Sequence, residues 1–365
     1  MESTKIDIAI IGGGIIGLWC AYEILKQKKD LTLVVFEKES YLGEHTTGRN
    51  SEVLHAGIYY KNNSLKHKLC IEGNRLWREF SKTNHLPLLD CGKFIVSNKT
   101  PDKLDRILSQ AIQNEVPKIR RATSREMAEL KDIVAADEAL ISETSAVLDT
   151  SSSLKCLEGL IERSNGIILK NSNIKNITSS QKGFTLVCNE DLIGAKIIIN
   201  CAGLFAIGLR EKLGLIDYSN RYVKGNYLKL TKKLAINRLI YPIPPDHGLG
   251  LGVHLTLDNQ GDQKFGPNTE ETETIDYSMK ESLIDELFEP IHEIFYNVKK
   301  SDLQLAYCGI RPKVCDKNKK LINDFIFNTP KEHSINNYFE LLGIESPGLT
   351  SAPAIAKMVV ESMRL

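Results

Sequence analysis

A glycine-rich turn after a short apolar segment constrains the fold of this chain more than any other feature of its sequence. Residues 6–11 form a nearly continuous apolar run, typical of a strand buried on both faces of a parallel sheet. Three glycines follow in G-x-G-x-x-G spacing: Gly12, Gly14 and Gly17. The first allows a tight turn, the second lets the backbone approach a pyrophosphate, and the third lets a helix pack closely on the sheet.

A helix and a second strand complete this motif. The helix is predicted over residues 15–28, and its first N–H groups, at Ile15 and Ile16, face phosphates with the positive end of the helix dipole. A second apolar run, residues 31–36, ends in Glu37, 20 residues after the last glycine, where a carboxylate can accept hydrogen bonds from a ribose diol. The complete order predicts a Rossmann-like α/β domain that binds an adenine dinucleotide, either NAD or FAD.

Length, charge and cysteine content limit the number of domains and the kinds of ligand and partner that we expect. With 365 residues the chain is long enough for two domains. It carries 47 basic and 46 acidic residues, a net charge of +1, so nucleic acid is not an expected partner. Its 8 cysteines are scattered without a C-x-x-C pair, which predicts reduced core thiols and no metal site.

The N-terminus enters the first strand almost at once and leaves no room for a targeting peptide, and no apolar run approaches the roughly 18 residues of a membrane-spanning helix. We therefore expect a cytoplasmic protein. Peripheral contact with the inner face of a membrane stays open.

The segment after Glu37 consists of a polar loop followed by an apolar stretch. Residues 38–51 are rich in hydroxyl, amide and glycine residues, which suits a loop that presents donors to a bulky polar group. Residues 53–60 are too apolar for a surface loop, so this part is expected to return to the interior.

Together with the glycine motif, the blocks T-T-G-R-N-S at 46–51 and H-A-G-I-Y-Y at 55–60 resemble the D-amino-acid oxidase superfamily of flavoproteins, most closely its L-2-hydroxyglutarate dehydrogenase/oxidase branch. The resemblance implies FAD as the cofactor. It also implies that the loop passes along the pyrophosphate and then the flavin, with these residues lining the cofactor: Lys38, Thr46, Thr47, Arg49, Asn50 and Ser51. His55 would approach the reactive face as the base that takes the hydroxyl proton.

Three later motifs keep the order found in that superfamily. A strand over 195–200 is followed by Ala202-Gly203, expected as a second dinucleotide contact that favours FAD over NAD. The block Gly309-Ile310-Arg311-Pro312 resembles the element that holds a substrate carboxylate through its arginine, beside the cofactor. Gly348-Leu349-Thr350 opens the last helix, whose N–H groups would stabilise negative charge on the reduced flavin.

Two segments supply further candidates for substrate binding. Lys224 and Tyr227 lie in a predicted strand over 221–230, and His254 lies in another over 250–256. By resemblance, any of the three could bind a distal carboxylate or the developing oxo group. The structural alternatives, a hydrogen-bonded core histidine for His254 and an ion pair for Arg311, stay open.

The remaining elements follow from apolar periodicity. Helices are expected between Ser64 and Pro87 and over 101–114, 124–130, 151–164, 279–296 and from 351 onward, and strands over 91–97, 166–170, 173–178, 184–189 and 338–343.

The predicted architecture is α/β with an α+β substrate part, in the manner of D-amino-acid oxidase. A discontinuous FAD domain would comprise 1–85, 147–214 and 306–365, and a sheet-based substrate domain 86–146 and 215–305. The predicted reaction is hydride transfer from an L-2-hydroxy acid, in particular L-2-hydroxyglutarate, to flavin N5, with oxygen, a quinone or a carrier flavoprotein as the final acceptor.

Alternatives within enzymes are a glycine- or sarcosine-type oxidase and a glycerol-3-phosphate dehydrogenase. The alternative outside enzymes is an NAD-binding regulatory protein. Covalent attachment of FAD through His45 is a further open point.

Overall fold

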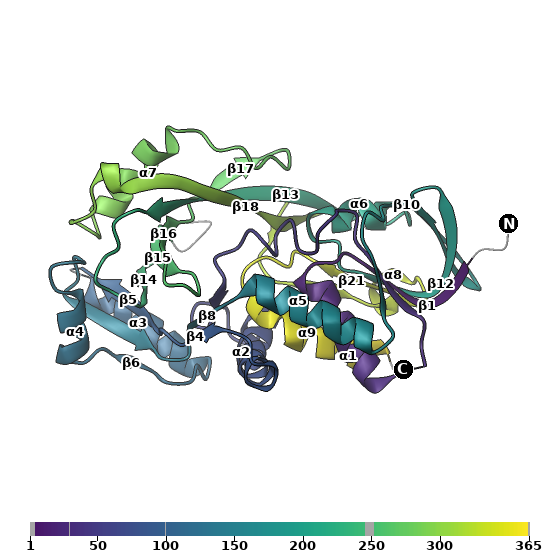
Figure 1. Ribbon diagram of the computed structural model, residues 1–365, viewed down its shortest axis with the longest axis horizontal. Helices are drawn as coiled ribbons and strands as arrows, with labels where there is room; N and C mark the ends of the chain where they lie inside the picture. The colour runs from purple at the N-terminus through teal and green to yellow at the C-terminus, as the bar shows by residue number, and fades with distance from the viewer. Residues whose placement is uncertain (1–3, 29, 99, 245–251, 364–365) are drawn as a thin grey trace. The chain divides into compact units, whose positions relative to one another are not determined.

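The structure is a computed structural model that describes residues 4–28, 30–98, 100–244 and 252–363. The chain divides into two compact units, each assembled from segments that are distant in sequence (Figure 1). The first unit comprises Met1–Gly48, Thr150–Tyr222 and Arg311–Leu365, and the second Arg49–Asp149 and Val223–Ile310.

The first unit is built on an eight-stranded sheet with the path β10-β11-β12-β1-β2-β9, to which β21 adds beside β12 and β20 beside β21. The strands are β1 (Thr4–Ile11), β2 (Leu33–Phe36), β9 (Ile167–Leu169), β10 (Ile174–Ser180), β11 (Gly183–Cys188), β12 (Asp191–Asn200), β20 (Ile326–Asn328) and β21 (Tyr338–Leu342). The centre is parallel: β1 pairs with β12 and β2, β2 with β9, and β12 with β21. The apolar residues of β1 and β2 are buried because layers cover both faces of a parallel sheet.

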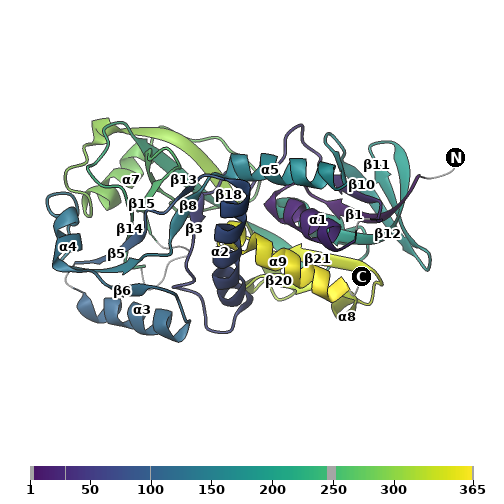
Figure 2. The same ribbon diagram turned by 60° about the horizontal axis from the view of Figure 1, so that its bottom comes forward.

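Helices pack on this sheet. α1 (Ile15–Gln27) lies between α5 (Thr150–Arg163) and α9 (Gly348–Met363), and all three lie side by side in Figure 2. The unit also contains η1 (Gly203–Phe205), α6 (Ala206–Glu211) and α8 (Pro330–His333). The α1 residues Leu18, Cys20 and Ala21 are completely buried, so this helix is core on most of its circumference, as its uniformly apolar sequence requires.

The second unit contains most of a ten-stranded sheet with the path β19-β18-β13-β16-β15-β14-β5-β7-β6, and β17 pairs with β13. These strands are β5 (Lys93–Ser97), β6 (Ile119–Arg121), β7 (Glu138–Ser142), β13 (Tyr218–Leu230), β14 (Leu239–Pro242), β15 (His254–Leu257), β16 (Gln263–Gly266), β17 (Glu270–Thr272), β18 (Leu303–Asp316) and β19 (Leu321–Ile322). A separate three-stranded sheet joins β3 (Val53–Leu54), β8 (Ala146–Leu148) and β4 (Leu88–Leu89).

Helices and apolar clusters complete the second unit. Its helices are α2 (Leu65–Asn84), α3 (Pro101–Gln113), α4 (Ser124–Leu130), α7 (Leu283–His292) and η2 (Lys300–Asp302). Phe94 and Val96 of β5 belong to one core cluster, whereas Ile95 belongs to another. Alternate residues of β5 therefore point to opposite faces of the sheet.

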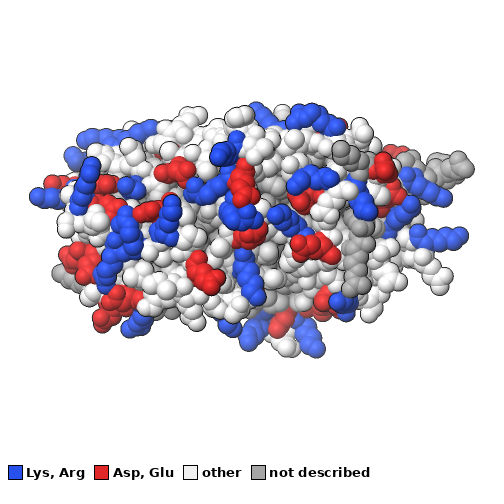
Figure 3. All heavy atoms as spheres, turned by 90° about the horizontal axis from the view of Figure 1, so that it is seen from below, with Lys and Arg blue, Asp and Glu red and all other residues white. Residues whose placement is uncertain are grey.

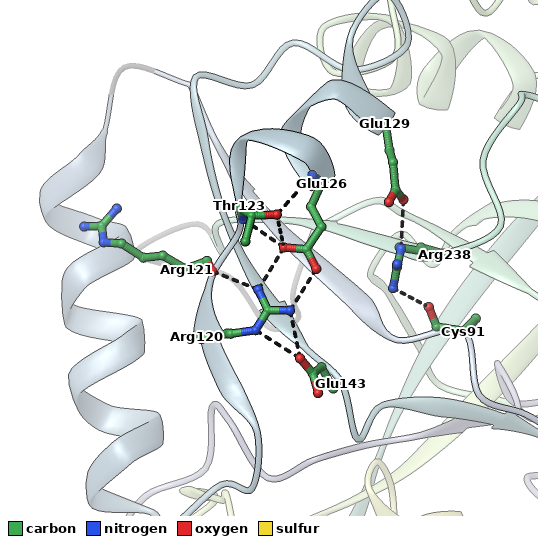
Figure 4. Close-up of polar contacts among 8 residues, drawn as sticks. All are labelled: Cys91, Arg120, Arg121, Thr123, Glu126, Glu129, Glu143 and Arg238. Carbon is green, nitrogen blue, oxygen red and sulfur yellow. Dashed lines mark hydrogen bonds and ion pairs between the residues drawn. The ribbon is translucent and has the colours of Figure 1, made fainter.

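An ion-pair network holds α4 in place (Figure 4). Thr123 and Glu126 form a capping box at the start of this helix. Arg120 of β6 donates to both carboxylate oxygens of Glu126, at 2.8 Å each, and also pairs with Glu143 at 2.8 Å. The bond with Arg120 lowers the pKa of Glu126 to about 2. Beside this network, Arg238 links the Glu129 carboxylate to the carbonyl of Cys91.

The face of the molecule in Figure 3 carries acidic and basic side chains in alternation. No helix within the described part of the chain combines the length and apolar character needed to cross a bilayer. Among the described residues, no group of three His, Cys, Asp or Glu side chains could hold a metal ion. All 8 cysteines are free.

The compact units differ from the expected domains mainly at residues 49–85, which pack with the second unit instead of the first. β3 pairs with β8, and the Asn114 side chain donates to the carbonyls of Gly57 and Tyr60, so this segment is bound to its neighbours in the second unit. Such long-range contacts are not visible in local sequence patterns.

Most predicted elements are present, with shifted ends. The predicted helix over 279–296 is shorter, Leu283–His292, and the last helix begins earlier, at Gly348. Residues 250–251 of a predicted strand and the final residues 364–365 lie outside the described residues.

Candidate active site

The polar stretches singled out in the first unit meet at one edge of its sheet. Strands β1, β2, β12 and β21 run parallel, so their carboxyl ends lie at the same edge. The glycine turn follows β1, Glu37 follows β2, Ala202-Gly203 follows β12, and the segment leading to Gly348 follows β21. In open α/β sheets, ligands bind beyond this edge.

The glycine turn has no room for side chains. Gly12 has φ +114°, and a Cβ there would lie 2.4 Å from the carbonyl oxygen of Cys201. A Cβ on Gly17 would lie 2.0 Å from the carbonyl oxygen of Gly12, and one on Gly14 would lie 3.0 Å from Thr47 Oγ1. Gly13, which the motif leaves free, is equally restricted, since its Cβ would lie 2.6 Å from Leu42 Cδ2. The turn therefore presents bare backbone at the sheet edge.

The loop after β2 is tied to this turn. Glu37 is buried, and its carboxylate accepts from the N–H of Gly13 at 2.8 Å and from the N–H of Glu39 at 2.9 Å. Each oxygen keeps a second lone pair with which it can accept a bond from a ribose hydroxyl. Thr47 Oγ1 accepts from the N–H of Ile15 at 3.1 Å, which places this predicted cofactor residue at the helix N-terminus.

Lys38 and His45 contact one aromatic ring. Lys38 Nζ lies 3.6 Å from the centre of the Phe205 ring, and the His45 ring packs edge-on against the same ring at 5.1 Å. His45 Nε2 also lies 2.9 Å from the Glu39 carboxylate. The structure thus gives His45 an ion-pair partner and an aromatic neighbour; attachment of FAD at this residue stays an open prediction.

The N-termini of α1 and α9 carry no acidic side chain in their first turns. The N-cap of α1, Gly14, makes no side-chain capping bond, and the neutral hydroxyl of Thr47 binds the N–H of Ile15, so the first turn of α1 itself supplies no negative charge at its positive dipole end. In the first turns of α9, Ser351 Oγ is buried without a hydrogen-bond partner among the described residues. Beside Gly203, which has φ +54°, a Cβ would meet nothing within 4 Å. Narrow backbone turns, open space and helix N-termini without acidic side chains in their first turns fit an anionic dinucleotide.

Arg311 in the first unit has an unused donor. It lies on β18, and its Nη1 is buried without a hydrogen-bond partner among the described residues. Lys313, two residues further on the same strand, pairs with Glu345 at 2.7 Å. The buried Nη1 gives Arg311 donor capacity for an acidic ligand, whereas Lys313 is already paired.

Four predicted cofactor residues lie in the second unit: Arg49, Asn50, Ser51 and Gly309. The Arg49 guanidinium lies 3.9 Å from the centre of the Tyr277 ring, and the Asn50 carbonyl accepts from Tyr307 Oη at 2.7 Å. Gly309 is required by close packing, since its Cβ would lie 2.0 Å from the carbonyl oxygen of Arg49. The structure thereby places Arg49, Asn50 and Gly309 together, with Ser51 next in the chain.

Polar side chains gather on one face of the large sheet. The rings of Tyr241 and His254 stack with centroids 3.8 Å apart, as expected for side chains on adjacent antiparallel strands. Further along the sheet, Tyr227 stacks on Tyr307 at 4.7 Å. His254 Nδ1 also lies 2.8 Å from the carbonyl oxygen of Gly252, which fixes the orientation of its ring.

His55 belongs to the same region. Burial lowers its pKa well below the ordinary value, and the charges of Lys93 and His254 lower it further. His55 is therefore neutral at physiological pH and can accept a proton. The structure brings His55 and His254 into electrostatic contact, which the sequence could not establish.

Lys224 is held by two polar partners within the second unit. It is buried, its Nζ donates to the carbonyl of Ser278, and it lies 3.6 Å from the Asp276 carboxylate. A role in substrate binding would require it to exchange these partners.

Sequence reasoning missed three residues of this region: Lys93, Tyr59 and Tyr241. Lys93 is 1% exposed, and its Nζ lies 4.5 Å from the Tyr241 ring centre and 5.2 Å from that of Tyr59. The available signal was a lysine opening the otherwise apolar strand segment K-F-I-V.

Comparison with known proteins agrees with this geometry. The model of the FAD dependent oxidoreductase family matches residues 7–362. The mitochondrial L-2-hydroxyglutarate dehydrogenase of Arabidopsis thaliana is 30% identical, over 98% of this chain and 83% of the relative. The L-2-hydroxyglutarate dehydrogenase of Indibacter alkaliphilus is 25% identical, over 97% of this chain and 98% of the relative. Among solved structures, FAD-bound L-α-glycerophosphate oxidase from Mycoplasma pneumoniae superimposes with a TM-score of 0.88 at 26% identity, over 100% of this chain and 96% of that one.

A parallel sheet with a glycine turn and helix N-termini at its carboxyl edge defines a dinucleotide-binding protein of the Rossmann-like class. The chain belongs to the FAD dependent oxidoreductase family, the D-amino-acid oxidase type. The predicted family, fold class and cofactor are thereby confirmed, and FAD rather than NAD is the dinucleotide.

Proposed function

We propose that this chain oxidises L-2-hydroxyglutarate to 2-oxoglutarate. The observation that carries the proposal is its similarity, over nearly its full length, to relatives from plants, animals and bacteria that are all named L-2-hydroxyglutarate dehydrogenase. The neutral histidine in the second unit supports it, because removing a hydride from an alcohol carbon also requires a base for the hydroxyl proton.

FAD would be held by the first unit, through its glycine turn, Glu37, Thr47, Ala202-Gly203 and the start of α9. When bound, it supplies the acceptor for the hydride that leaves C2 of the substrate. The chain has to bind and orient the substrate and manage one proton. As the C2–H bond breaks, the hydroxyl loses its proton to His55 and the C2–O bond becomes a carbonyl. The lowered pKa of His55 supports this role, since the base must start unprotonated.

Arg311 would bind the C1 carboxylate. Its buried, unpartnered Nη1 supports this assignment, because an unused guanidinium nitrogen in the interior is costly unless a ligand accepts from it. A guanidinium can make two parallel bonds to one carboxylate, which would also fix the orientation of C2. His254 and Tyr227 would contact the developing oxo group, and Lys224 stays a weaker candidate because Ser278 and Asp276 already bind it.

A second candidate function is oxidation of glycerol 3-phosphate, favoured by the similarity to L-α-glycerophosphate oxidase. The two functions are separated by adding each compound to the purified, FAD-loaded protein without oxygen. We expect the visible flavin bands to bleach with L-2-hydroxyglutarate, and not with its D-isomer, glycine or glycerol 3-phosphate. Bleaching by glycerol 3-phosphate alone would reject the proposal in favour of the second candidate.

The electron acceptor is proposed to be oxygen, a quinone or a carrier flavoprotein, and the reoxidation rate of the reduced protein with each acceptor distinguishes them. A cytoplasmic location, with peripheral contact at the inner face of a membrane, is likewise a proposal; relatives from plants and animals are named mitochondrial.

A further inference from the structure

Lys93 occupies a position where a charged side chain is unexpected. It opens β5, in the interior of the large sheet, where it is opposite Leu239 of β14 and Ser142 of β7. Phe94 and Val96 face one core cluster, so Lys93 projects from the opposite face, together with Ile95. Only 1% of its surface is exposed.

The ammonium group has no anionic partner in the part of the chain that the structure describes. Its described polar contacts are with the faces of two aromatic rings, those of Tyr241 and Tyr59. Such cation–π contacts recover only part of the hydration that a buried cation loses. Burial lowers the pKa of Lys93 to about 8, so at neutral pH most molecules still carry the charge. A buried charge of this kind lowers the stability of the folded protein, so its presence calls for a functional explanation.

The hydroxyl groups on the same two rings are also unused. Tyr59 Oη and Tyr241 Oη are both buried, and neither has a hydrogen-bond partner among the described residues. One ammonium and two phenol groups therefore share a region of the interior, and among the described residues no carboxylate pairs with the ammonium and no group accepts from either phenol. A carboxylate has about four acceptor positions and a full negative charge, so one such group has enough acceptors for all three donors.

This region lies beside the proposed base. Tyr241 stacks on His254, and the charges of both Lys93 and His254 act on His55. All these residues belong to the second unit. A ligand held by Lys93 would therefore have another part within reach of His55.

We propose that Lys93, Tyr59 and Tyr241 form a subsite for a carboxylate remote from the reacting carbon, so that the enzyme selects dicarboxylic over monocarboxylic 2-hydroxy acids. This inference rests on the proposed function, in which Arg311 takes the carboxylate next to C2. Within the second unit, Lys93 would hold the remote carboxylate and His55 would face the hydroxyl group. Selection then arises because a methyl group in this subsite would leave three buried donors unpaired.

Binding of unreactive analogues to the FAD-loaded protein tests the subsite without relying on turnover. Glutarate carries both carboxylates, and pentanoate has the same chain length with a methyl group in place of one of them. We expect wild-type protein to bind glutarate more tightly in isothermal titration calorimetry. Lys93→Met should weaken glutarate binding by about 10- to 100-fold and leave pentanoate binding unchanged. Tyr59→Phe and Tyr241→Phe should each weaken glutarate binding by about 2- to 10-fold.

Lys229→Met is the matched control, since Lys229 is an exposed lysine on β13 of the same sheet and its loss changes the net charge equally. It should bind glutarate as wild type does. Unchanged glutarate binding in Lys93→Met overturns the proposal. An equal loss of affinity for glutarate and pentanoate also overturns it, because Lys93 would then bind the carboxylate that both compounds contain.

Steady-state kinetics with L-2-hydroxyglutarate and L-2-hydroxypentanoate provide a second test of the subsite. Lys93→Met should raise KM for the dicarboxylic substrate alone, and an equal rise for both would again overturn the proposal. If wild-type protein binds glutarate through Lys93 but does not oxidise L-2-hydroxyglutarate, the subsite is supported and the proposed function fails. The two failures are therefore distinguishable.

Discussion

The ammonium nitrogen of Lys93 lies 4.5 Å from the centre of the Tyr241 ring, in the interior of the large sheet, whereas the buried Lys224 and Lys313 of the same sheet each lie beside a carboxylate. A charge buried without a carboxylate should make the protein less stable than it could be. Functional sites often carry such a cost, because the groups that bind a ligand remain unsatisfied until it arrives.

Lys93→Met should therefore stabilise the ligand-free protein. Burial lowers the folded-state pKa to about 8, against about 10.4 in an unfolded chain, so the gain at neutral pH is about 1 to 3 kcal/mol. Between these two values the unfolded chain binds more protons, so the contribution of Lys93 to wild-type stability rises as pH increases from about 8 to about 10.4. The difference between wild type and variant should shrink over that window.

Urea unfolding of both proteins at several pH values measures this difference in stability. Both proteins contain the same neighbouring titratable groups, so the contributions of these groups cancel to first order in the difference: Tyr59, Tyr241, Cys70, His55 and His254. A variant that is less stable than wild type at pH 7 would contradict the argument and make Lys93 a structural residue.

Replacement of His55 should slow the chemical step. His55→Ala is expected to lower the rate of flavin reduction by L-2-hydroxyglutarate by about 10²- to 10⁴-fold, the usual effect of losing a general base. Because burial and positive neighbours lower its pKa, the wild-type rate should stay constant down to about pH 6.5 and fall only at lower pH. Anaerobic stopped-flow absorbance measures both effects, and a normal rate in His55→Ala would remove the residue from the mechanism.

Replacement of Arg311 by lysine should mainly affect binding. Arg311→Lys keeps the charge but loses the planar pair of donors, so KM should rise by about 10- to 100-fold. Steady-state kinetics with L-2-hydroxyglutarate and L-2-hydroxypentanoate should show the same rise for both, since both contain the carboxylate next to C2. An effect confined to one of them would show that Arg311 binds elsewhere on the substrate.

The glycine turn should tolerate no side chain at Gly17. Gly17→Ala would place a methyl group 2.0 Å from the carbonyl oxygen of Gly12, so α1 must move from the sheet. We expect loss of bound FAD, measured as the ratio of visible to ultraviolet absorbance after purification. Gly208→Ala on α6 is the control: its Cβ would meet nothing within 4 Å, so FAD content should not change. Full FAD content in Gly17→Ala would reject the close packing seen here.

A buried ion pair in the first unit should be required for stability. Arg210 is 1% exposed and donates to both carboxylate oxygens of Glu340 at 3.1 Å, and Asn328 donates to the same carboxylate at 2.8 Å. Glu340→Gln removes the buried carboxylate beside Arg210, leaves the exposed Asp217 as its described acidic partner, and should cost about 3 kcal/mol. The exposed Glu211→Gln on α6 should cost less than about 0.5 kcal/mol. Equal urea midpoints for the two variants would contradict this assignment.

Residues 6–37 determine one half of the site by themselves. The apolar strand, the three spaced glycines and the acid after the second strand are close in sequence, and their spacing corresponds directly to strand, turn and helix geometry. The existence of α9 also follows from the sequence, although the structure starts this helix at Gly348, three residues before the expected position. For this reason the order of residues along the chain is sufficient to predict the fold class and a bound adenine dinucleotide.

Tertiary structure alone decided the surroundings of Lys93. Its contacts come from Tyr59, in the loop after β3, and from Tyr241, on a parallel neighbour of β5 that is far away in sequence. Pairing register between distant strands sets which side chains share a face, and no local pattern contains that information. A lysine in an apolar strand is visible in the sequence, but the absence of a described carboxylate beside it depends on every neighbour that folding brings near.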